Sequence, residues 1–303
     1  MIDNTAFKKE LEERVKEINA GIAGYLPEEK GCQKTIFEAM NYSMNAGGKR
    51  LRPLLMQEVC RLFTGEVSEI VKPFMAAIEM IHTSSLVHDD LPCMDDDMIR
   101  RGKASTWAEY GEDIGVLAGD ALMMYAFETA SKAFDAAEDA DALLRAGKAM
   151  GILAAKTGVY GMIGGQTVDV ELAGGPVPKD KLDFIYRLKT GALLEASMVI
   201  GAVMAGASEA ECGTVERMAA AIGLAFQIQD DILDVTSTEE ELGKPIHSDE
   251  KNHKTTYVTL MGIEKASQQV KKLSDEAVTL FEGLNKKNEF LFTLVNELVG
   301  RRK

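Results

Sequence analysis

Cysteine is scarce in this chain of 303 residues: only Cys32, Cys60, Cys93 and Cys212 occur, and they are far apart. No Cys-x-x-Cys pair or other metal-ligand spacing is present, which excludes a cysteine-based metal module. Isolated thiols of this kind are typical of a reduced chain. We therefore expect a cytoplasmic location.

Long hydrophobic runs are also missing. The longest candidate, Ala196 to Ala207, is well short of the roughly 20 residues that a membrane-spanning helix needs. The N-terminal segment contains Glu10, Glu12 and Glu13 and lacks the apolar centre of a secretory signal. We expect neither membrane insertion nor secretion.

Proline and aromatic residues are few, with 7 prolines and 6% aromatics. No Ser/Pro-rich linker, low-complexity tract or solenoid repeat divides the chain. Abundant alanine, leucine and methionine favour an all-α protein with a large core, and we expect a single domain over residues 1–303. The net charge of −14 argues against binding to nucleic acid or to anionic membranes.

Carboxylates, by contrast, are concentrated in two places. The first cluster follows an apolar helical run from Phe74 to Val87 and consists of Asp89, Asp90, Asp95, Asp96 and Asp97. Carboxylates this close repel one another unless a cation lies among them. Mg²⁺ suits such ligands and commonly binds through one or two carboxylates plus substrate phosphates. The alternative is a solvated acidic loop.

The second cluster is Asp230, Asp231 and Asp234, in an alanine- and leucine-rich stretch that predicts a helix. Asp230 and Asp234 are four residues apart and share one helix face. Their neighbours Ile228 and Ile232 are apolar, so unpaired carboxylates here would be costly without a nearby cation or water. We predict that the two acidic helices face each other and hold a polyphosphate through shared Mg²⁺.

Glycines and cations indicate further ligand contacts. Lys49, Arg50 and Arg52 stand where a helix begins after Gly47-Gly48, and such a start attracts anions; a solvated basic turn is the alternative. Gly164 and Gly165 lie in a helix predicted over 158–172 and indicate either ligand approach or a tight helix crossing. Lys189 lies on an apolar helix within 178–206 and needs an anionic partner or a route to solvent.

Together these segments resemble the trans-polyprenyl diphosphate synthase family, of the short-chain geranylgeranyl/farnesyl diphosphate synthase type. The first cluster resembles its first aspartate-rich motif, with four residues between the aspartate pair and the next aspartate, and Asp230-Asp231-x-x-Asp234 resembles its second. The blocks that match occur in family order: Gly47–Pro53, Gly164–Gln166, Lys189–Gly191, Gly243–Pro245 and Lys254–Tyr257.

The resemblance implies the isoprenoid synthase type I fold, a helical bundle around a central cavity, and a homodimer. It implies an enzyme that condenses isopentenyl diphosphate with dimethylallyl, geranyl or farnesyl diphosphate by using three Mg²⁺ ions. The implied metal ligands are Asp89, Asp90 and Asp95 for two ions and Asp230, Asp231 and Asp234 for the third.

The same resemblance assigns the substrate contacts. Isopentenyl diphosphate is expected at Lys49, Arg52, His82 and Arg101. The allylic diphosphate is expected at Arg100, Lys189 and Lys244, beside Gln166. Thr190, Gln227 and Lys254 complete the substrate-binding set, and the loop 236–253 is expected to form a lid. Lys189 and Lys244 are also catalytic, because they neutralise the leaving diphosphate.

In this chemistry the allylic C–O bond ionises, the double bond of isopentenyl diphosphate attacks the allylic cation, and the released diphosphate takes the proton. No Ser/His/Asp or Cys/His arrangement is needed, and none is visible.

Product length is expected to depend on Ser84, Ser85 and Ile81, just before Asp89. Fifteen-carbon-making relatives commonly have an aromatic residue at the position of Ser84. One helical turn of about 5.4 Å is comparable to one isoprene unit. We therefore predict a geranylgeranyl product, with farnesyl as the alternative.

Three other classes of protein are alternatives. A class I terpene cyclase shares the helical fold, but its second metal motif typically mixes Asn or Asp with Ser/Thr and Glu. A non-catalytic partner subunit usually loses aspartates, whereas both sets are whole here. A Ca²⁺-binding scaffold would need a glycine-centred loop that this chain lacks.

Overall fold

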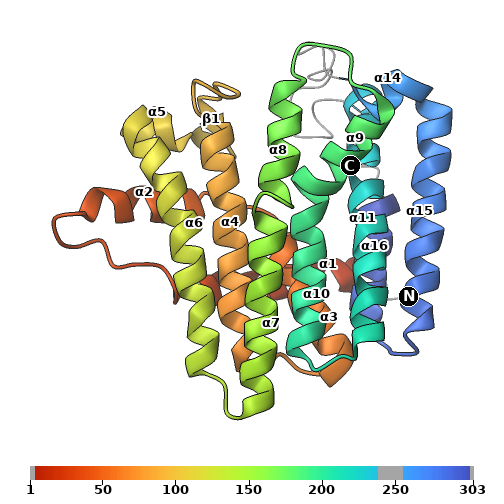
Figure 1. The fold of residues 1–303 in the computed structure, drawn as a ribbon, viewed down its shortest axis with the longest axis horizontal. Coiled ribbons are helices and arrows are strands. Elements are labelled where there is room, and N and C mark those ends of the chain that lie inside the picture. Colours follow the sequence, from red (N-terminus) through yellow and green to blue (C-terminus); the bar gives the residue numbers. More distant parts are fainter. Residues whose placement is uncertain (1–3, 238–254, 301–303) are drawn as a thin grey trace.

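Helices make up nearly all the regular structure in residues 4–237 and 255–300, which the computed structural model describes (Figure 1). The N-terminal part contains α1 (Asn4–Ala23), α2 (Lys34–Met44), α3 (Leu51–Thr64), the 3₁₀ turn η1 (Glu69–Val71) and α4 (Lys72–Asp89). Next come the short strands β1 (Ile99–Arg100) and β2 (Lys103–Ala104), then α5 (Thr106–Tyr110), α6 (Glu112–Asp135), α7 (Ala140–Thr157) and α8 (Met162–Glu171).

The rest of the described chain contains α9 (Lys179–Ile185), the π-helix η2 (Tyr186–Gly191), α10 (Ala192–Met204), α11 (Glu209–Thr236), α14 (Tyr257–Met261), α15 (Ile263–Gly283) and α16 (Glu289–Gly300). The strands form one antiparallel ribbon in which Ile99 pairs with Ala104. The prediction of an all-α fold is confirmed.

The bundle is built around α10, in which every residue is buried. This helix packs against α3, α7 and α11, while α4 lies along α6 and α11 lies along α15. A helix that is apolar on all sides must be covered on all sides, so α10 forms the centre of the core. One hydrophobic cluster extends from Phe7 to Val295 and includes residues of nearly every described helix.

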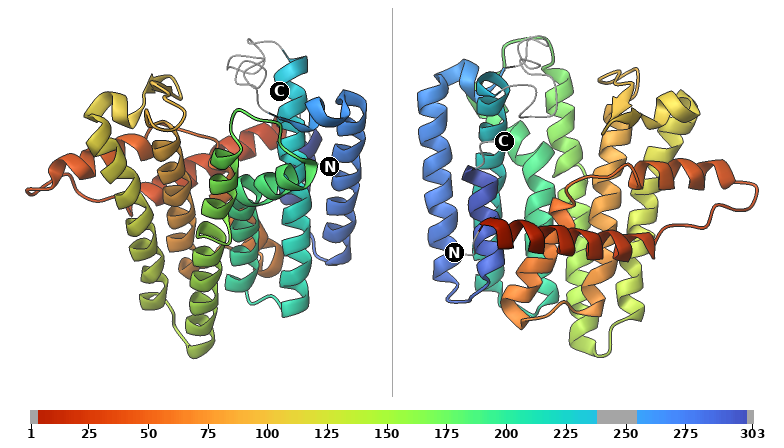
Figure 2. Two further views of the ribbon diagram at one scale, coloured as in Figure 1. Left: turned by 45° about the horizontal axis from the view of Figure 1, so that its top comes forward. Right: turned by 180° about the vertical axis from the view of Figure 1, so that it is seen from behind.

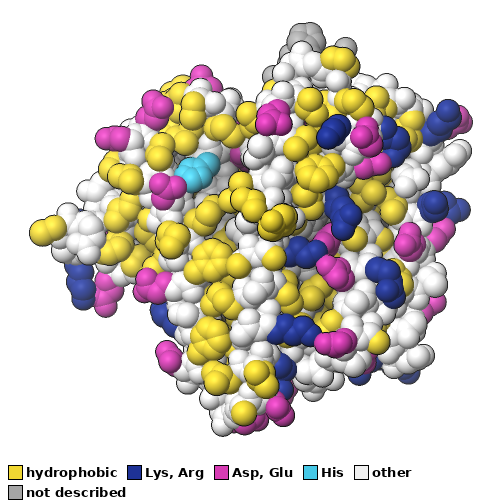
Figure 3. Space-filling model, in the orientation of Figure 1, with side chains coloured by type: hydrophobic (Ala, Val, Ile, Leu, Met, Phe, Trp, Pro, Cys, Tyr) yellow, Lys and Arg dark blue, Asp and Glu magenta, His cyan; other side chains and the backbone are white. Residues whose placement is uncertain are grey.

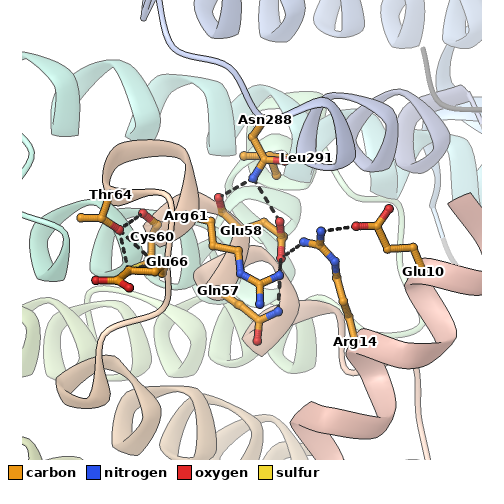
Figure 4. Close-up of polar contacts among 10 residues, drawn as sticks. All are labelled: Glu10, Arg14, Gln57, Glu58, Cys60, Arg61, Thr64, Glu66, Asn288 and Leu291. Carbon is orange, nitrogen blue, oxygen red and sulfur yellow. Dashed lines mark hydrogen bonds and ion pairs between the residues drawn. The ribbon is translucent and has the colours of Figure 1, made fainter.

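The N-terminal helix α1 crosses behind this bundle (Figure 2, right). It is held by Glu58 of α3, whose fully buried carboxylate pairs with Arg14 of α1 and with Arg61 one turn further along α3 (Figure 4). Asn288, just before α16, also donates to Glu58 Oε2 at 3.0 Å. A buried carboxylate is stable only with such partners, and these join the first and last described helices.

Two predicted boundaries differ from the structure. The helix predicted over 158–172 begins only at Met162, because the segment before it is a turn. The helix predicted within 178–206 is divided into α9, η2 and α10. The expected lid, 236–253, and its cations Lys244 and Lys254 lie almost wholly outside the described residues. Among the helices that are described, none is both long and apolar enough to span a membrane.

Candidate active site

One cavity of about 460 Å³ opens where α8, η2 and α11 meet the loop after α4 and the stretch before α14. It brings Asp95 from the first acidic cluster into the same wall as the second cluster, although more than 130 residues of sequence separate them. The polar residues that line it are Asp95, Gln166, Asp169, Tyr186, Lys189, Thr190, Gln227, Asp230, Asp231, Asp234, Thr255 and Thr256.

Asp89 ends α4 next to this cavity. Its Oδ1 accepts a hydrogen bond of 2.8 Å from Nε2 of Gln166, which lines the cavity from α8. The chain then turns back, and the backbone N–H of Asp95 donates to the carbonyl of Asp89 at 2.9 Å. Burial raises the pKa of Asp89, Lys189 opposes that rise and Asp95 adds to it. This carboxylate therefore lies where a cation would be stabilising.

Asp90 has a different environment, although it is the next residue. Its side chain is buried and forms a forked ion pair with Arg100 of β1, with Nε 2.9 Å from Oδ1. Arg100 also contacts Asp97 at 3.0 Å. The residues expected as a metal ligand and as a diphosphate ligand are thus paired with each other in this structure.

The second acidic cluster lies near the C-terminal end of α11. Asp230 is half-buried, and Asp234 lies one turn further on; both line the cavity together with Gln227. Asp231 lines it too, but both of its oxygens accept hydrogen bonds of 2.9 Å from the hydroxyl of Tyr186. The spacing of four residues therefore does place Asp230 and Asp234 at one site.

Lys189 and Thr190 reach the cavity from the π-helix η2. A π-helix is rare and is frequently found at functional sites. Lys189 pairs with Asp169 of α8 at 2.6 Å. Burial disfavours the charge on Lys189, but the pairing with Asp169 outweighs it and raises the pKa of the lysine.

Asp169 is absent from the predicted set of site residues. The signal that could have found it is its position three residues after Gln166, because residues spaced i, i+3 share one helix face. The glycines before it explain how α8 comes so close: a Cβ on Gly165 would lie 2.3 Å from the backbone nitrogen of Lys189. Close packing of α8 on η2 is therefore the reason for that glycine.

A second group of polar residues, expected to bind isopentenyl diphosphate, gathers between α3, α4 and the β ribbon. Arg52 has a buried Nε with no hydrogen-bond partner in the described part of the chain, and burial lowers its pKa to about 10. Burial, reinforced by the guanidinium groups of Arg52 and Arg101, lowers the pKa of His82 well below its ordinary value. Lys49 is exposed nearby in sequence.

Arg50 does not join this group. It adopts φ +48° and is buried, and it donates to Glu79 Oε1 at 2.9 Å, Asn19 Oδ1 at 2.8 Å and the carbonyl of Met44 at 2.6 Å. Of the three cations in the Gly-Gly-Lys-Arg-Leu-Arg segment, Arg50 thus ties α1, α2 and α4 together.

The residues expected to limit product length lie inside α4. Ser84 is fully buried and its hydroxyl donates to the carbonyl of Gly119 on α6 at 2.9 Å. Ile81 is fully buried as well. Ser85 is half-buried, and its hydroxyl donates to the carbonyl of His82 in its own helix.

The donors at the cavity suit a hard cation, because they are carboxylate oxygens of Asp95, Asp230 and Asp234 with Asp89 beside them. Within residues 4–237 and 255–300, however, no three His, Cys, Asp or Glu side chains converge closely enough to form a complete metal centre. Mg²⁺ fits this arrangement because it takes few protein carboxylates and completes its shell with substrate phosphates and water.

The structure thus combines an all-α bundle with two aspartate-bearing helix ends at one cavity. The chain belongs to the polyprenyl synthetase family, whose sequence model matches residues 33–291. The family expected from the motifs is thereby confirmed.

Individual relatives agree. The chain is 47% identical over 245 residues to the heterodimeric geranylgeranyl pyrophosphate synthase large subunit 1 of Arabidopsis thaliana. The matched residues are 80% of this chain and 65% of that protein. The chain is 44% identical over 252 residues to the geranylgeranyl diphosphate synthase of Cyanophora paradoxa, covering 82% and 81%. The chain thus spans about two thirds of the length of the Arabidopsis relative.

Solved structures show the same fold. An FPP/GFPP synthase from Zymomonas mobilis superposes with a TM-score of 0.84 at 33% identity, over 97% of this chain and 99% of that one. A geranyltransferase from Helicobacter pylori, complexed with magnesium and isoprenyl diphosphate, gives 0.81 at 29% identity, over 99% and 98%.

Proposed function

We propose that this protein is a trans-prenyltransferase that condenses isopentenyl diphosphate with allylic diphosphates. The observation that supports this most is the shared cavity, in which Asp95 meets Asp230 and Asp234. The structure of the Helicobacter pylori relative with magnesium and isoprenyl diphosphate supports the same substrate class. The buried, unpartnered Nε of Arg52 adds a donor that a diphosphate would satisfy.

When bound, Mg²⁺ supplies Lewis-acid stabilisation of the diphosphate leaving group. Asp89, Asp95, Asp230 and Asp234 would hold it, and the number of ions stays a prediction of three. Lys189, kept protonated by Asp169, would hold the allylic diphosphate. Arg52 and Arg101, with neutral His82, would hold isopentenyl diphosphate so that its double bond faces the allylic carbon.

We propose geranylgeranyl diphosphate as the product. The relatives from Arabidopsis thaliana and Cyanophora paradoxa are named for that product, and Ser84 is small at the position where fifteen-carbon-making relatives commonly have an aromatic residue. Farnesyl diphosphate is the alternative, because the Zymomonas mobilis structure is of an FPP/GFPP synthase.

The product is tested by incubating the protein with Mg²⁺, isopentenyl diphosphate and dimethylallyl diphosphate, and identifying the prenyl chains by chromatography. We expect twenty-carbon chains. A parallel incubation with one allylic diphosphate alone tests the terpene cyclase alternative, because a cyclase makes hydrocarbon without isopentenyl diphosphate. Hydrocarbon in that incubation would contradict the proposal.

The proposal for Ser84 has its own test. Tyrosine at this position must occupy space between α4 and α6, because Ser84 is fully buried against Gly119. We expect Ser84→Tyr to shorten the product to fifteen carbons, whereas Ser84→Ala should keep it. An unchanged product in the tyrosine variant would show that the growing chain does not pass this position.

We also propose a homodimer of single-domain subunits. Several large apolar side chains are exposed on α6, on α7 and at the start of α8, where Figure 3 shows a broad hydrophobic area. They include Leu117 and Met124, Leu143 and Leu144, and Val159 and Tyr160. Contiguous exposed apolar surface of this kind is typical of subunit interfaces. The cytoplasmic location stays a prediction.

A further inference from the structure

The loop 92–98, which brings Asp95 into the wall of the cavity, lies on the surface of the molecule. Every one of its residues is exposed, including Met94 at 37% and Met98 at 61%. A segment with so little buried apolar surface opens easily unless hydrogen bonds hold it. The position of Asp95 therefore depends on the groups that bind this loop.

The end of the loop is fixed at Asp97. The backbone N–H of Asp97 donates to the carbonyl of Asp90 at 3.1 Å, and its carboxylate pairs with Arg100 at 3.0 Å. Its carbonyl accepts a hydrogen bond of 3.0 Å from Nε1 of Trp107. Arg100 is also expected to bind the allylic diphosphate, whereas Trp107 is not among the residues expected to touch a substrate. The hydrogen bond from the indole therefore does not compete with substrate binding.

Trp107 is itself held on two sides. It is partly buried in α5, and the residue before it, Thr106, shares a hydrogen bond of 2.7 Å with the hydroxyl of Ser43 on α2. A Cβ on Gly115 of α6 would lie 2.9 Å from the Cβ of Trp107, so α6 packs directly against the tryptophan. The position of the indole is thus set by α2 and α6, and the loop is attached to a fixed donor.

The chain between Asp95 and Asp97 makes this attachment important for the cavity. Asp96 adopts φ +53°, a conformation that is unfavourable for a residue other than glycine and persists only where neighbouring contacts enforce it. The N–H of Asp95 donates to the carbonyl of Asp89 at 2.9 Å, so the short turn is held at both ends. Release of Asp97 would let the turn relax and would move the Asp95 carboxylate.

We propose that Trp107 is a positioning residue: by donating to the carbonyl of Asp97 it fixes the loop 92–98 and keeps Asp95 at the cavity. The inference rests on the proposed prenyltransferase function and names a residue that acts on the site without touching the substrate. Functional side chains generally need to be held within about 0.5 Å of their productive position, which an exposed loop achieves only through such supports.

The test compares Trp107→Phe, which keeps an aromatic ring and removes the donor, with Tyr125→Phe. Tyr125 is the matched control, because its hydroxyl also donates to a backbone carbonyl, that of Tyr25, at 3.0 Å in another part of the fold. Three quantities are measured for each protein: hydrogen exchange of peptides covering 93–98 without metal, the melting temperature without metal, and the Kd of inorganic diphosphate at a fixed Mg²⁺ concentration by calorimetry. Exchange and binding are measured well below the melting temperature.

For Trp107→Phe we expect faster exchange of the Asp97 amide in the metal-free protein. The Kd of diphosphate with Mg²⁺ should rise about two- to tenfold, the change in an equilibrium that corresponds to the loss of one neutral hydrogen bond. For Tyr125→Phe we expect a comparable change in melting temperature, with exchange over 93–98 and the Kd both unchanged.

Unchanged exchange in Trp107→Phe would show that the loop keeps its shape without the indole, and would overturn the inference. Faster exchange with an unchanged Kd would overturn it too, because the hydrogen bond would then be merely structural. An equal rise of the Kd in Tyr125→Phe would trace the weaker binding to a general loss of stability, against the inference. A wild-type protein that does not bind diphosphate with Mg²⁺ would instead count against the proposed function, and the exchange comparison would still test the attachment of the loop.

Discussion

The Asp89 side chain shows a conflict between the stability of the metal-free fold and the binding of a cation. Burial raises the pKa of this carboxyl, so its ionised form destabilises the metal-free fold at neutral pH. Its hydrogen bond from Gln166 needs only an acceptor oxygen, which asparagine also has. Such a cost of burying the ionised carboxylate is expected where a cation is to bind.

We therefore expect Asp89→Asn to raise the metal-free melting temperature by about 1–3 °C and to lower turnover at least about a hundredfold. Calorimetry without metal and steady-state kinetics with Mg²⁺ measure the two effects. Asp169→Asn is the control, because it breaks an ion pair of 2.6 Å with Lys189 and should lower stability. A less stable Asp89→Asn protein would show that this charge is compensated within the fold.

His82 gives a pH dependence of the opposite direction, although burial is the main cause for both residues. Its pKa is lowered well below the ordinary value by burial and by the guanidinium groups of Arg52 and Arg101. The unfolded chain takes up a proton on this residue below about pH 6.5, whereas the folded chain does not. Stability from this residue is therefore complete above that pH and is lost as the pH falls.

The free energy of unfolding of the wild type should decrease between pH 7.5 and pH 5.5 by more than that of His82→Gln. The difference should reach up to about 1.4 kcal/mol per pH unit below the unfolded pKa. Denaturant unfolding at both pH values gives the comparison. Equal pH dependence in the two proteins would mean that His82 titrates normally in the folded state.

The roles of residues could be predicted from the sequence where helical spacing alone decides in which direction a side chain points. Asp230 and Asp234 are four apart on a helix, and they do reach one cavity. Arg50 and Arg52 could not be separated in this way, because the positive φ of Arg50 turns its side chain toward Glu79. The pairing of Asp90 with Arg100 depends on how the chain folds back after α4, which no local pattern encodes.

At the scale of the elements, the packing of α8 on η2 decides where Lys189 lies. A Cβ at Gly165 would lie 2.3 Å from the nitrogen of Lys189 and 2.8 Å from the carbonyl carbon of Leu188, both of them backbone atoms. Backbone cannot yield as a side-chain tip can, so the two elements must separate. The sequence shows the glycine, but only the structure shows that η2 is what approaches it.

Gly165→Ala should therefore lower both the melting temperature and kcat. Gly213→Ala in α11 is the matched control, because nothing lies within 4 Å of the added Cβ. That variant should be as stable as the wild type or up to about 1 kcal/mol more stable. If Gly165→Ala behaves like the control, the close contact between α8 and η2 does not govern the site.

The long helices that bear the two acidic clusters follow from the sequence, since their apolar content is high and uninterrupted. The π-helix does not, because its pattern is that of any buried helix. Its extra residue per turn is compatible with the tight contact at Gly165 and with the anchoring of Tyr186 by Asp231. Both are tertiary contacts, and such contacts override the preference of the local sequence for an ordinary α-helix.

At the scale of the whole molecule, the exposed apolar face of α6, α7 and α8 predicts self-association. Leu144, near the start of α7, is 72% exposed. We expect Leu144→Glu to convert a dimer to a monomer at micromolar concentration in sedimentation velocity. Ile263→Glu is the control, since Ile263 is 45% exposed on α15 and away from this face. A dimer that persists in Leu144→Glu would place the interface elsewhere.

The central claim also belongs to this scale: two acidic helix ends, distant in sequence, act on one metal-bound diphosphate. The most direct test is calorimetric binding of inorganic diphosphate with Mg²⁺ to the wild type, Asp89→Asn, Asp230→Asn and the double variant. We predict that each single change weakens binding about tenfold or more and that the double variant is little weaker than either, because both remove support from the same ligand. Fully additive losses, or a loss in only one single variant, would contradict a shared site.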